Sequence, residues 1–222
     1  MNRPQIVGVG GFASDVGKTT LMCELLHHLS GWEAIKTTRG HYRSCGKDPH
    51  SCCVSHLLSD EPVILSGRDH TYAHAKDTGR YWDAGASNVH WMIVTDAQVE
   101  KGISQTLELV RSAGVVIEGN SFSQFVDLDY FIMVARGNDF KIKGSARRAL
   151  RKVSAFYLSD NADPDVFKNR LTQLGFADSI AAPIYTPATL PQLLTEVHLI
   201  LTRLQPGDRE ALESKTVSTV FS

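Results

Sequence analysis

The chain has 222 residues, a formal net charge of −1 at pH 7 and a hydrophobic fraction of 42%. This length is enough to bury a core, and the balanced charge argues against nucleic acid or an anionic membrane as a partner. No apolar run approaches the length of a membrane span, and four cysteines beside a phosphate-binding motif suggest reduced thiols in the cytoplasm. We therefore expect a cytoplasmic protein with a domain over residues 1–205 and a polar tail over 206–222.

A strand, a glycine-rich loop and a helix are predicted in succession at the start of the chain. Ile6–Val9 is a short apolar run, and the helix that begins near Leu21 places apolar residues on one face before Gly31 ends it. A loop of this kind directs backbone N–H groups and a helix N-terminus at an anion, which suits the phosphates of a nucleotide. The residues expected to bind the nucleotide are Gly11, Ser14, Asp15, Val16, Gly17, Lys18, Thr19 and Thr20.

Individual roles follow from the pattern Gly17-Lys18-Thr19. Lys18 would reach the outer phosphates, and the hydroxyl of Thr19 would ligate Mg²⁺. The loop departs from the common spacing, because Phe12 holds the position expected for the first glycine and Gly11 lies one residue earlier. Asp15 is a candidate for orienting water or the ligand of a neighbouring subunit.

A second strand, Ala34–Ile35, is predicted to close at Lys36, which either neutralises charge on a transferred phosphoryl group or is a solvated strand end. The polar stretch that follows, about residues 38–60, is an insertion without helical or strand periodicity. Its candidate ligands for Zn²⁺ or another soft metal are Cys45, Cys52, Cys53 and His56. Because a Cys-x-x-Cys pair is absent, unliganded thiols, redox chemistry and a lid over the phosphates remain alternatives.

The rest of the chain alternates strands with helices. Strands are predicted at 89–95, 115–118, 130–135 and 153–158, with helices at 99–110 (capped by Asp96), 163–174 and 190–204 and a short basic helix before residue 153. This order predicts an α/β fold with a mostly parallel sheet and helices on both faces, the three-layer, Rossmann-like architecture of a phosphate-loop NTPase. Glu118 ends an aliphatic strand and precedes a glycine, which is where such enzymes place the acid that holds Mg²⁺ or its water.

For two further groups of residues, the sequence favours a structural role over a binding role. The basic residues between 136 and 152 are expected to form the solvated face of a short helix, with an acidic partner or an anionic ligand as the alternative. They are Arg136, Lys141, Lys143, Arg147, Arg148, Arg151 and Lys152. Trp82, Trp91, Phe122 and Phe125 are expected in the core rather than stacked on a base.

The phosphate loop, with its additional residue, resembles that of dethiobiotin synthetase and its relatives in the signal-recognition-particle, MinD and BioD class of phosphate-loop NTPases. A closer resemblance is to the molybdopterin-guanine dinucleotide biosynthesis protein B family. It covers about residues 5–175, and its matching segments are the phosphate loop, Ile35–Thr37, Lys76–Ala86, Val116–Gly119 and Ala155–Asp160. The resemblance implies a GTP-binding adaptor of molybdenum cofactor assembly, with Lys18, Thr19 and Glu118 at the nucleotide and Asp77 as a further Mg²⁺ ligand in the same site.

The chain also departs from that family. Residues 38–45 replace its histidine-rich stretch, and no Asn-Lys-x-Asp guanine reader follows a strand. Residues 135–139 and Asp160-Asn161 lie at base-reading positions without selecting guanine over adenine, so the nucleotide is GTP or ATP.

These observations predict a magnesium-dependent nucleoside triphosphatase whose catalytic residues are Lys18, Lys36 and Glu118. It would act as a homodimeric adaptor in molybdenum cofactor biosynthesis, together with a cofactor-assembly protein. The alternatives are a metal-delivery NTPase that uses the Cys/His cluster, an ATP-dependent ligase or kinase similar to dethiobiotin synthetase, and a nucleotide switch with negligible turnover.

Overall fold

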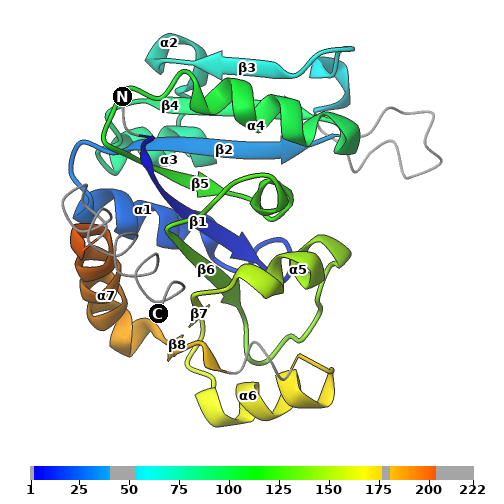
Figure 1. Cartoon of the computed structure of the whole chain (residues 1–222), viewed down its shortest axis with the longest axis vertical. Coiled ribbons are helices and arrows are strands. Elements are labelled where there is room, and N and C mark those ends of the chain that lie inside the picture. The colour runs from blue at the N-terminus through cyan, green and yellow to red at the C-terminus, as the bar shows by residue number, and fades with distance from the viewer. Residues whose placement is uncertain (1–2, 41–53, 177–180, 204–222) are drawn as a thin grey trace, which may run out of the picture.

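The structure is a computed structural model that describes residues 3–40, 54–176 and 181–203. Within these residues the strands form one eight-stranded sheet in the order β3-β4-β2-β5-β1-β6-β7-β8 (Figure 1). Every neighbouring pair is parallel except β3 and β4, which are antiparallel. The strands are β1 Gln5–Gly11, β2 Glu33–Arg39, β3 Val63–Ser66, β4 Val89–Val94, β5 Gly114–Glu118, β6 Tyr130–Ala135, β7 Ala155–Leu158 and β8 Ile184–Tyr185.

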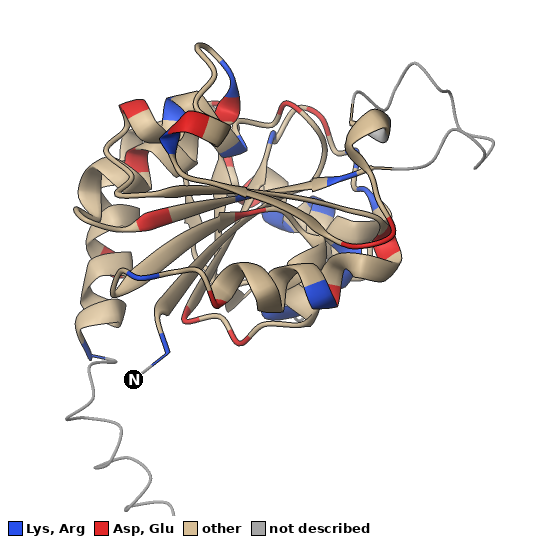
Figure 2. Cartoon of the chain, turned by 90° about the horizontal axis from the view of Figure 1, so that it is seen from above, with Lys and Arg blue, Asp and Glu red and all other residues tan. Residues whose placement is uncertain are grey.

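Helices cover both faces of the sheet, as the edge-on view in Figure 2 shows. They are α1 Lys18–His28, α2 Arg68–Thr71, α3 Asp77–Asp83, α4 Val99–Leu107, α5 Gly144–Ala149, α6 Pro164–Gln173 and α7 Leu190–Arg203. Apolar residues of α1, α3 and α7 form one core with the sheet, and those of α4, α5 and α6 form a second core on its other face. The predicted α/β fold, with a mostly parallel sheet and helices on both faces, is confirmed.

The parallel register brings the predicted site residues to one edge of the sheet. Val9 of β1 and Lys36 of β2 are both register partners of Glu118 on β5. In sheets of this kind the ligand site lies beyond the carboxyl ends of the strands. The loop after β1, the end of β2 and the end of β5 are therefore adjacent in space although they are far apart in sequence.

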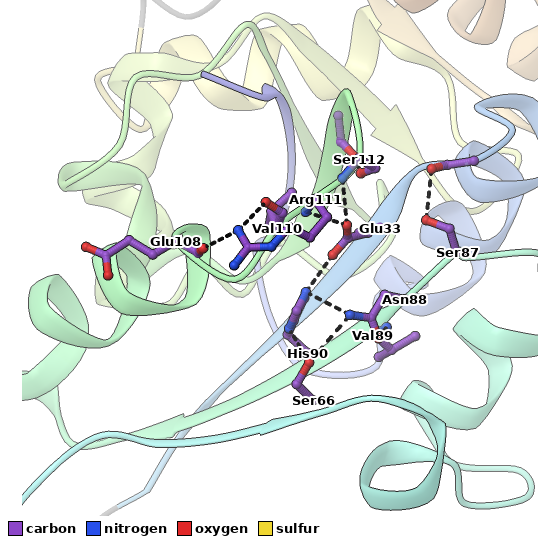
Figure 3. Close-up of polar contacts among 12 residues, drawn as sticks. Glu33, Ser66, Ser87, Asn88, Val89, His90, Glu108, Val110, Arg111 and Ser112 are labelled. Carbon is purple, nitrogen blue, oxygen red and sulfur yellow. Dashed lines mark hydrogen bonds and ion pairs between the residues drawn. The ribbon is translucent and has the colours of Figure 1, made fainter. Parts of the chain in front are cut away.

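A buried polar network lies at the opposite, amino-terminal end of the same strands (Figure 3). Glu33, the first residue of β2, lies 2.7 Å through Oε2 from Nε2 of His90 on β4. Its Oε1 accepts hydrogen bonds of 2.7 and 2.8 Å from the backbone N–H groups of Arg111 and Ser112, just before β5. Ser66 of β3 contacts the other ring nitrogen of His90 at 2.9 Å. The network connects four neighbouring strands.

Several predicted boundaries differ from the structure. β2 continues to Arg39, so the strand is longer than predicted and the insertion begins within it. Asp96 is not the cap before α4: the capping box is formed by Thr95 and Gln98, while Asp96 pairs with Arg39 at 2.6 Å. Elements β3, α2, α3 and β8 were not predicted.

The burial of the aromatic residues was predicted correctly only in part. Phe122 is fully buried, Trp82 and Trp91 are half-buried, and Phe125 is 45% exposed, so the prediction of a core position for Phe125 is wrong. In the part of the chain that the structure describes, no helix combines the length and apolar character needed to cross a membrane.

Candidate phosphate-binding site

The glycine-rich loop connects β1 directly to α1. Gly17 precedes the helix in the left-handed region with φ 94°, and its carbonyl accepts the N–H of Leu21 at 3.1 Å. Asp15, exposed at the tip, has φ 56°, which non-glycine residues seldom adopt. The N-terminus of α1, with its unsatisfied backbone N–H groups, opens at this loop, and this arrangement favours an anion.

Lys18 packs across the glycine that begins the loop. A Cβ atom on Gly11 would lie 2.7 Å from Cδ of Lys18 and 2.9 Å from Cγ2 of Val16, so only glycine fits there. The ammonium group of Lys18 donates to the carbonyl of Ala13 at 3.2 Å. Burial lowers the pKa of Lys18, because a charged amine is disfavoured away from water. An anionic ligand beside this amine would raise its pKa and favour the charged form.

Phe12 explains the additional residue of the loop. Its side chain is fully buried and stacks on Phe167 with ring centroids 5.7 Å apart, and Phe156 lies at 6.3 Å. Its backbone is also held on both sides, since its N–H donates to Val134 and its carbonyl accepts from Lys143. The residue that occupies the usual glycine position is thus an anchor of the loop in the core.

Two residues outside the motif hold the loop in place. Asn120, which follows β5, accepts from the N–H of Gly11 through Oδ1 and donates to its carbonyl through Nδ2, both at 2.8 Å. Lys143 donates from Nζ to the hydroxyl of Ser14 at 2.6 Å. Lys143, predicted as part of a solvated basic stretch, therefore adds a positive charge beside the loop.

Thr19, Asp77 and Glu118 place oxygen atoms around one point at the start of α1. The hydroxyl of Thr19 lies 3.0 Å from Oδ1 of Asp77 and 3.1 Å from Oε2 of Glu118. This hydroxyl has one proton, so it donates to one carboxylate at a time. Glu118 is 3% exposed, whereas the side chain of Asp77 is 43% exposed.

Lys36 supplies the positive charge between the two carboxylates. Its ammonium lies 2.5 Å from Oδ2 of Asp77 and 2.6 Å from Oε1 of Glu118. Burial alone would lower the pKa of Lys36, but the charges of Glu118 and Asp77 outweigh it and raise this pKa. Burial likewise would raise the pKa of Asp77, and the hydrogen bond and charge of Lys36 outweigh it and lower that pKa. Lys36 and Asp77 are therefore held in their charged forms.

Tyr81 contacts the site from the protein core. Its fully buried hydroxyl donates to Oε2 of Glu118. Burial, together with the charge of Glu118, raises the pKa of Tyr81 well above its ordinary value, so the phenol remains a donor. Tyr81 and Asp77 both belong to α3, one turn apart, and this short helix positions both against the phosphate loop.

The oxygen donors fit a hard divalent cation. A threonine hydroxyl and two carboxylates within 3.1 Å of it are the ligand type that Mg²⁺ prefers, whereas a soft metal needs thiolate or imidazole. Cys45, Cys52 and Cys53 lie outside the described residues, and His56 is exposed on a short 3₁₀ helix, Ser55–Leu57. Among the described residues there is no group of three or more histidine, cysteine or acidic side chains placed to hold a metal.

Lys18, Thr19, Lys36, Asp77 and Glu118 lie together in the structure, and the binding and catalytic roles predicted for them stay predictions. Thr20 points elsewhere, because its hydroxyl accepts a long hydrogen bond of 3.4 Å from Arg80. The roles of Tyr81 and Asn120 were not predicted. Tyr81 lies in a segment that carries the resemblance, but no pattern in the sequence indicates that Asn120 binds Gly11.

The two segments proposed for base reading follow β6 and β7 and contact each other beside the loop. Asp160 accepts from the backbone N–H groups of Gly137 and Asn138 at 3.1 and 3.3 Å, so both of its carboxylate oxygens are used inside the protein. The same edge approaches the loop, since a Cβ on Gly17 would lie 2.9 Å from Cβ of Ser159. Asn138 and Asn161 remain exposed there.

No protein-family model matches the chain, and no curated protein does. Among solved structures, the chain is similar to the "apo" form of LpxK from Aquifex aeolicus in complex with ATP, with a TM-score of 0.45 and 17% sequence identity over 71% of this chain. The chain spans about half of that protein, 48% of its length. Similarity at this level does not indicate an activity.

Proposed function

We propose that the chain binds the magnesium complex of a nucleoside triphosphate at the loop Gly11–Thr20 and hydrolyses it. The observation that carries this proposal is that carboxylate oxygens of Asp77 and Glu118 both lie within 3.1 Å of the Thr19 hydroxyl. This hydroxyl is at the point where the glycine-rich loop meets helix α1. A merely structural turn would not need two carboxylates and a half-buried lysine at its helix start.

Each residue then has a defined task in the proposed reaction. The loop amides and Lys18 hold the phosphates, and Thr19, Asp77 and Glu118 hold the cation that accompanies them. When bound by these three residues, Mg²⁺ would supply neutralisation of the phosphate charge. Lys36 lies beside the same carboxylates and is placed to stabilise charge that develops during phosphoryl transfer. Tyr81 fixes the orientation of Glu118 from beneath.

The proposed biological role is that of an adaptor in molybdenum cofactor assembly that uses GTP or ATP. It rests on the resemblance stated above, and it is supported by the way the Lys76–Ala86 segment meets the phosphate loop, through Asp77 and Tyr81. An adaptor would turn over slowly by itself and faster with a pterin-nucleotide enzyme. A turnover rate unchanged by such a partner, but increased by a small carboxylate substrate, would favour a ligase or kinase instead.

Nucleotide binding is tested by Lys18→Ala. Because a charge-assisted hydrogen bond contributes about 1.5–3 kcal/mol, affinity for ATP or GTP should fall roughly 10- to 150-fold. Calorimetric titration with each nucleotide, with and without Mg²⁺, measures this loss and identifies the preferred base. Lys168→Ala, an exposed lysine on α6, is the matched control and should bind as the unmodified chain does. Full affinity in Lys18→Ala would contradict the proposal.

A further inference from the structure

We infer that a basic groove on the α5 face of the sheet binds a small ligand that carries a phosphate or diphosphate group. The groove has a volume of about 570 Å³ and is lined by Ser123, Gln124, Arg147, Arg148, Arg151 and Lys152. Ser123 and Gln124 belong to the 3₁₀ helix η4, Ser121–Gln124, and the four cations belong to α5 and its continuation η5, Leu150–Lys152. None of these residues belongs to the phosphate-loop site, so this proposal goes beyond the function proposed above.

The positive charge of the groove is concentrated and uncompensated. No acidic residue occurs between Gly144 and Val153, and cations four positions apart, such as Arg147 and Arg151, face the same side of a helix and repel each other. Within the described part of the chain, no carboxylate forms an ion pair with any of the four cations. With a net charge of only −1 for the whole chain, this cluster is a local feature that an anion would stabilise.

Two of the cations are held in place and two are available. Lys152 donates from Nζ to the carbonyl of Val126 at 3.1 Å, and the guanidinium of Arg147 lies 5.4 Å from the ring of Phe176. The side chains of Arg148 and Arg151 are exposed and have no hydrogen bond or ion pair with a described residue. These two guanidinium groups can therefore bind a ligand without first breaking an internal contact.

The chemistry of the groove favours phosphate over a peptide carboxylate. A guanidinium group presents parallel N–H donors that match two phosphate oxygens, and three of the four cations are arginines. The groove is concave, and its volume of about 570 Å³ lies within the roughly 300–1,000 Å³ typical of small-molecule sites. The exposed amide of Gln124 adds a neutral donor at the same wall.

The groove is connected to the phosphate loop through one short segment. η4 begins three residues after Glu118, and Asn120, between them, binds both backbone groups of Gly11. The same Asn120 amide lies 3.4 Å from the hydroxyl of Ser145 on α5. The groove and the phosphate loop are therefore separate sites on either side of Asn120.

Inorganic pyrophosphate is the probe, and amide chemical shifts locate where it binds. In Mg²⁺-free solution it should shift the amides of residues 121–126 and 144–153, separately from those of the phosphate loop. Arg148→Gln with Arg151→Gln should weaken binding at the groove by at least about tenfold, while the shifts of the loop amides stay unchanged. Lys168→Gln with Arg203→Gln removes the same charge from α6 and α7 and should leave both sets of shifts as they were.

The two proposals fail in different ways in this titration. Absent shifts at the loop count against nucleotide binding, and absent shifts at residues 121–126 and 144–153 overturn the groove. If both double variants lose the same affinity for pyrophosphate, or if sulfate binds the groove as tightly as pyrophosphate does, the effect is general charge screening. Either result would also overturn the groove proposal. Tighter binding of hexaglutamate than of pyrophosphate at the groove would replace the phosphate ligand by an acidic protein segment.

Discussion

Lys36 lies between two carboxylates, 2.5 Å from Asp77 and 2.6 Å from Glu118, and this position gives it two separable effects. Its charge neutralises the carboxylates in the free protein and thus competes with a cation for the same oxygens. In the proposed reaction the same charge would stabilise phosphoryl transfer. Removing the charge should therefore change cation binding and turnover in opposite directions.

Lys36→Met tests this separation. Turnover should fall about 100-fold or more, which is the range for losing one electrostatic stabiliser of a transition state. Mg²⁺ affinity without nucleotide should rise, because the Lys36 ammonium no longer neutralises the carboxylates of Asp77 and Glu118. Steady-state phosphate release and calorimetry with MgCl₂ measure the two effects. Lys101→Met is the control, since Lys101 forms an exposed ion pair with Glu61. Weaker Mg²⁺ binding with undiminished turnover would show that Lys36 is structural.

The sequence predicted those site residues whose place follows from the sheet. Lys36 and Glu118 are register partners on the neighbouring parallel strands β2 and β5, so their proximity follows from the strand pairing and needs no knowledge of side-chain packing. Asp77 was predicted only through the family resemblance. Tyr81 and Asn120 depend on how α3 docks and how the chain turns after β5, and neither contact leaves a periodic pattern in the sequence.

At the scale of elements, α3 is the part of the site with the tightest packing requirement. It has seven residues, Asp77–Asp83, and carries both Asp77 and Tyr81. A Cβ atom on its Gly79 would lie 2.0 Å from the carbonyl oxygen of Ala73, which is backbone and cannot rotate away. The helix can therefore approach the preceding loop this closely only because residue 79 is a glycine.

Gly79→Ala should displace α3 and impair the site along with the fold. Overpacking of this kind costs about 1–3 kcal/mol, and the shift of Asp77 and Tyr81 should lower turnover and Mg²⁺ affinity together. Urea denaturation and phosphate release are the measurements. Gly144→Ala on α5 is the matched control, because its Cβ would lie 3.9 Å from the nearest atom, the guanidinium of Arg148. If both variants behave alike, packing at Gly79 does not position the site.

Elements without a long apolar pattern were the ones missed. β3 has four half-buried residues at the antiparallel edge of the sheet, α2 has four residues and β8 has two. Such short segments are specified by their neighbours in the fold, since a single turn or a two-residue bridge has little stability by itself. By contrast, β1, β5 and β6 are buried over nearly their whole length and α1 has a buried apolar face, and the sequence predicted each of these elements near its observed position in the chain.

For the molecule as a whole, the two ends of the sheet serve different purposes. The carboxyl ends carry the candidate site, and the amino ends are connected by the Glu33–His90 network of Figure 3. Glu33 of the network and Lys36 of the site both belong to β2. Ser112 lies just before β5 and Glu118 ends it, so these two strands connect the network to the site. Removing the buried network should therefore lower the stability of the fold without removing any group of the site.

Glu33→Gln is the variant that tests this, since glutamine keeps the shape and one acceptor oxygen but lacks the charge. Glu33 is 3% exposed, and losing the charged partner of buried hydrogen bonds should cost about 2–3 kcal/mol of unfolding free energy. Glu61→Gln, whose partner Lys101 is exposed, should cost less than about 0.5 kcal/mol. Urea denaturation at neutral pH compares the two variants.

The pH dependence gives the same prediction a second, independent measurement. Burial would raise the pKa of Glu33, but the hydrogen bonds from His90, Arg111 and Ser112 outweigh it and lower this pKa below its ordinary 4.5. Because the folded state then binds fewer protons, the stabilisation is complete above pH 4.5 and is lost as the pH falls through the lowered pKa. The stability difference between the unmodified chain and Glu33→Gln should thus be constant from neutral pH to about 5 and shrink below that. A difference that persists undiminished in strong acid would show that the charge of Glu33 is not what stabilises the fold.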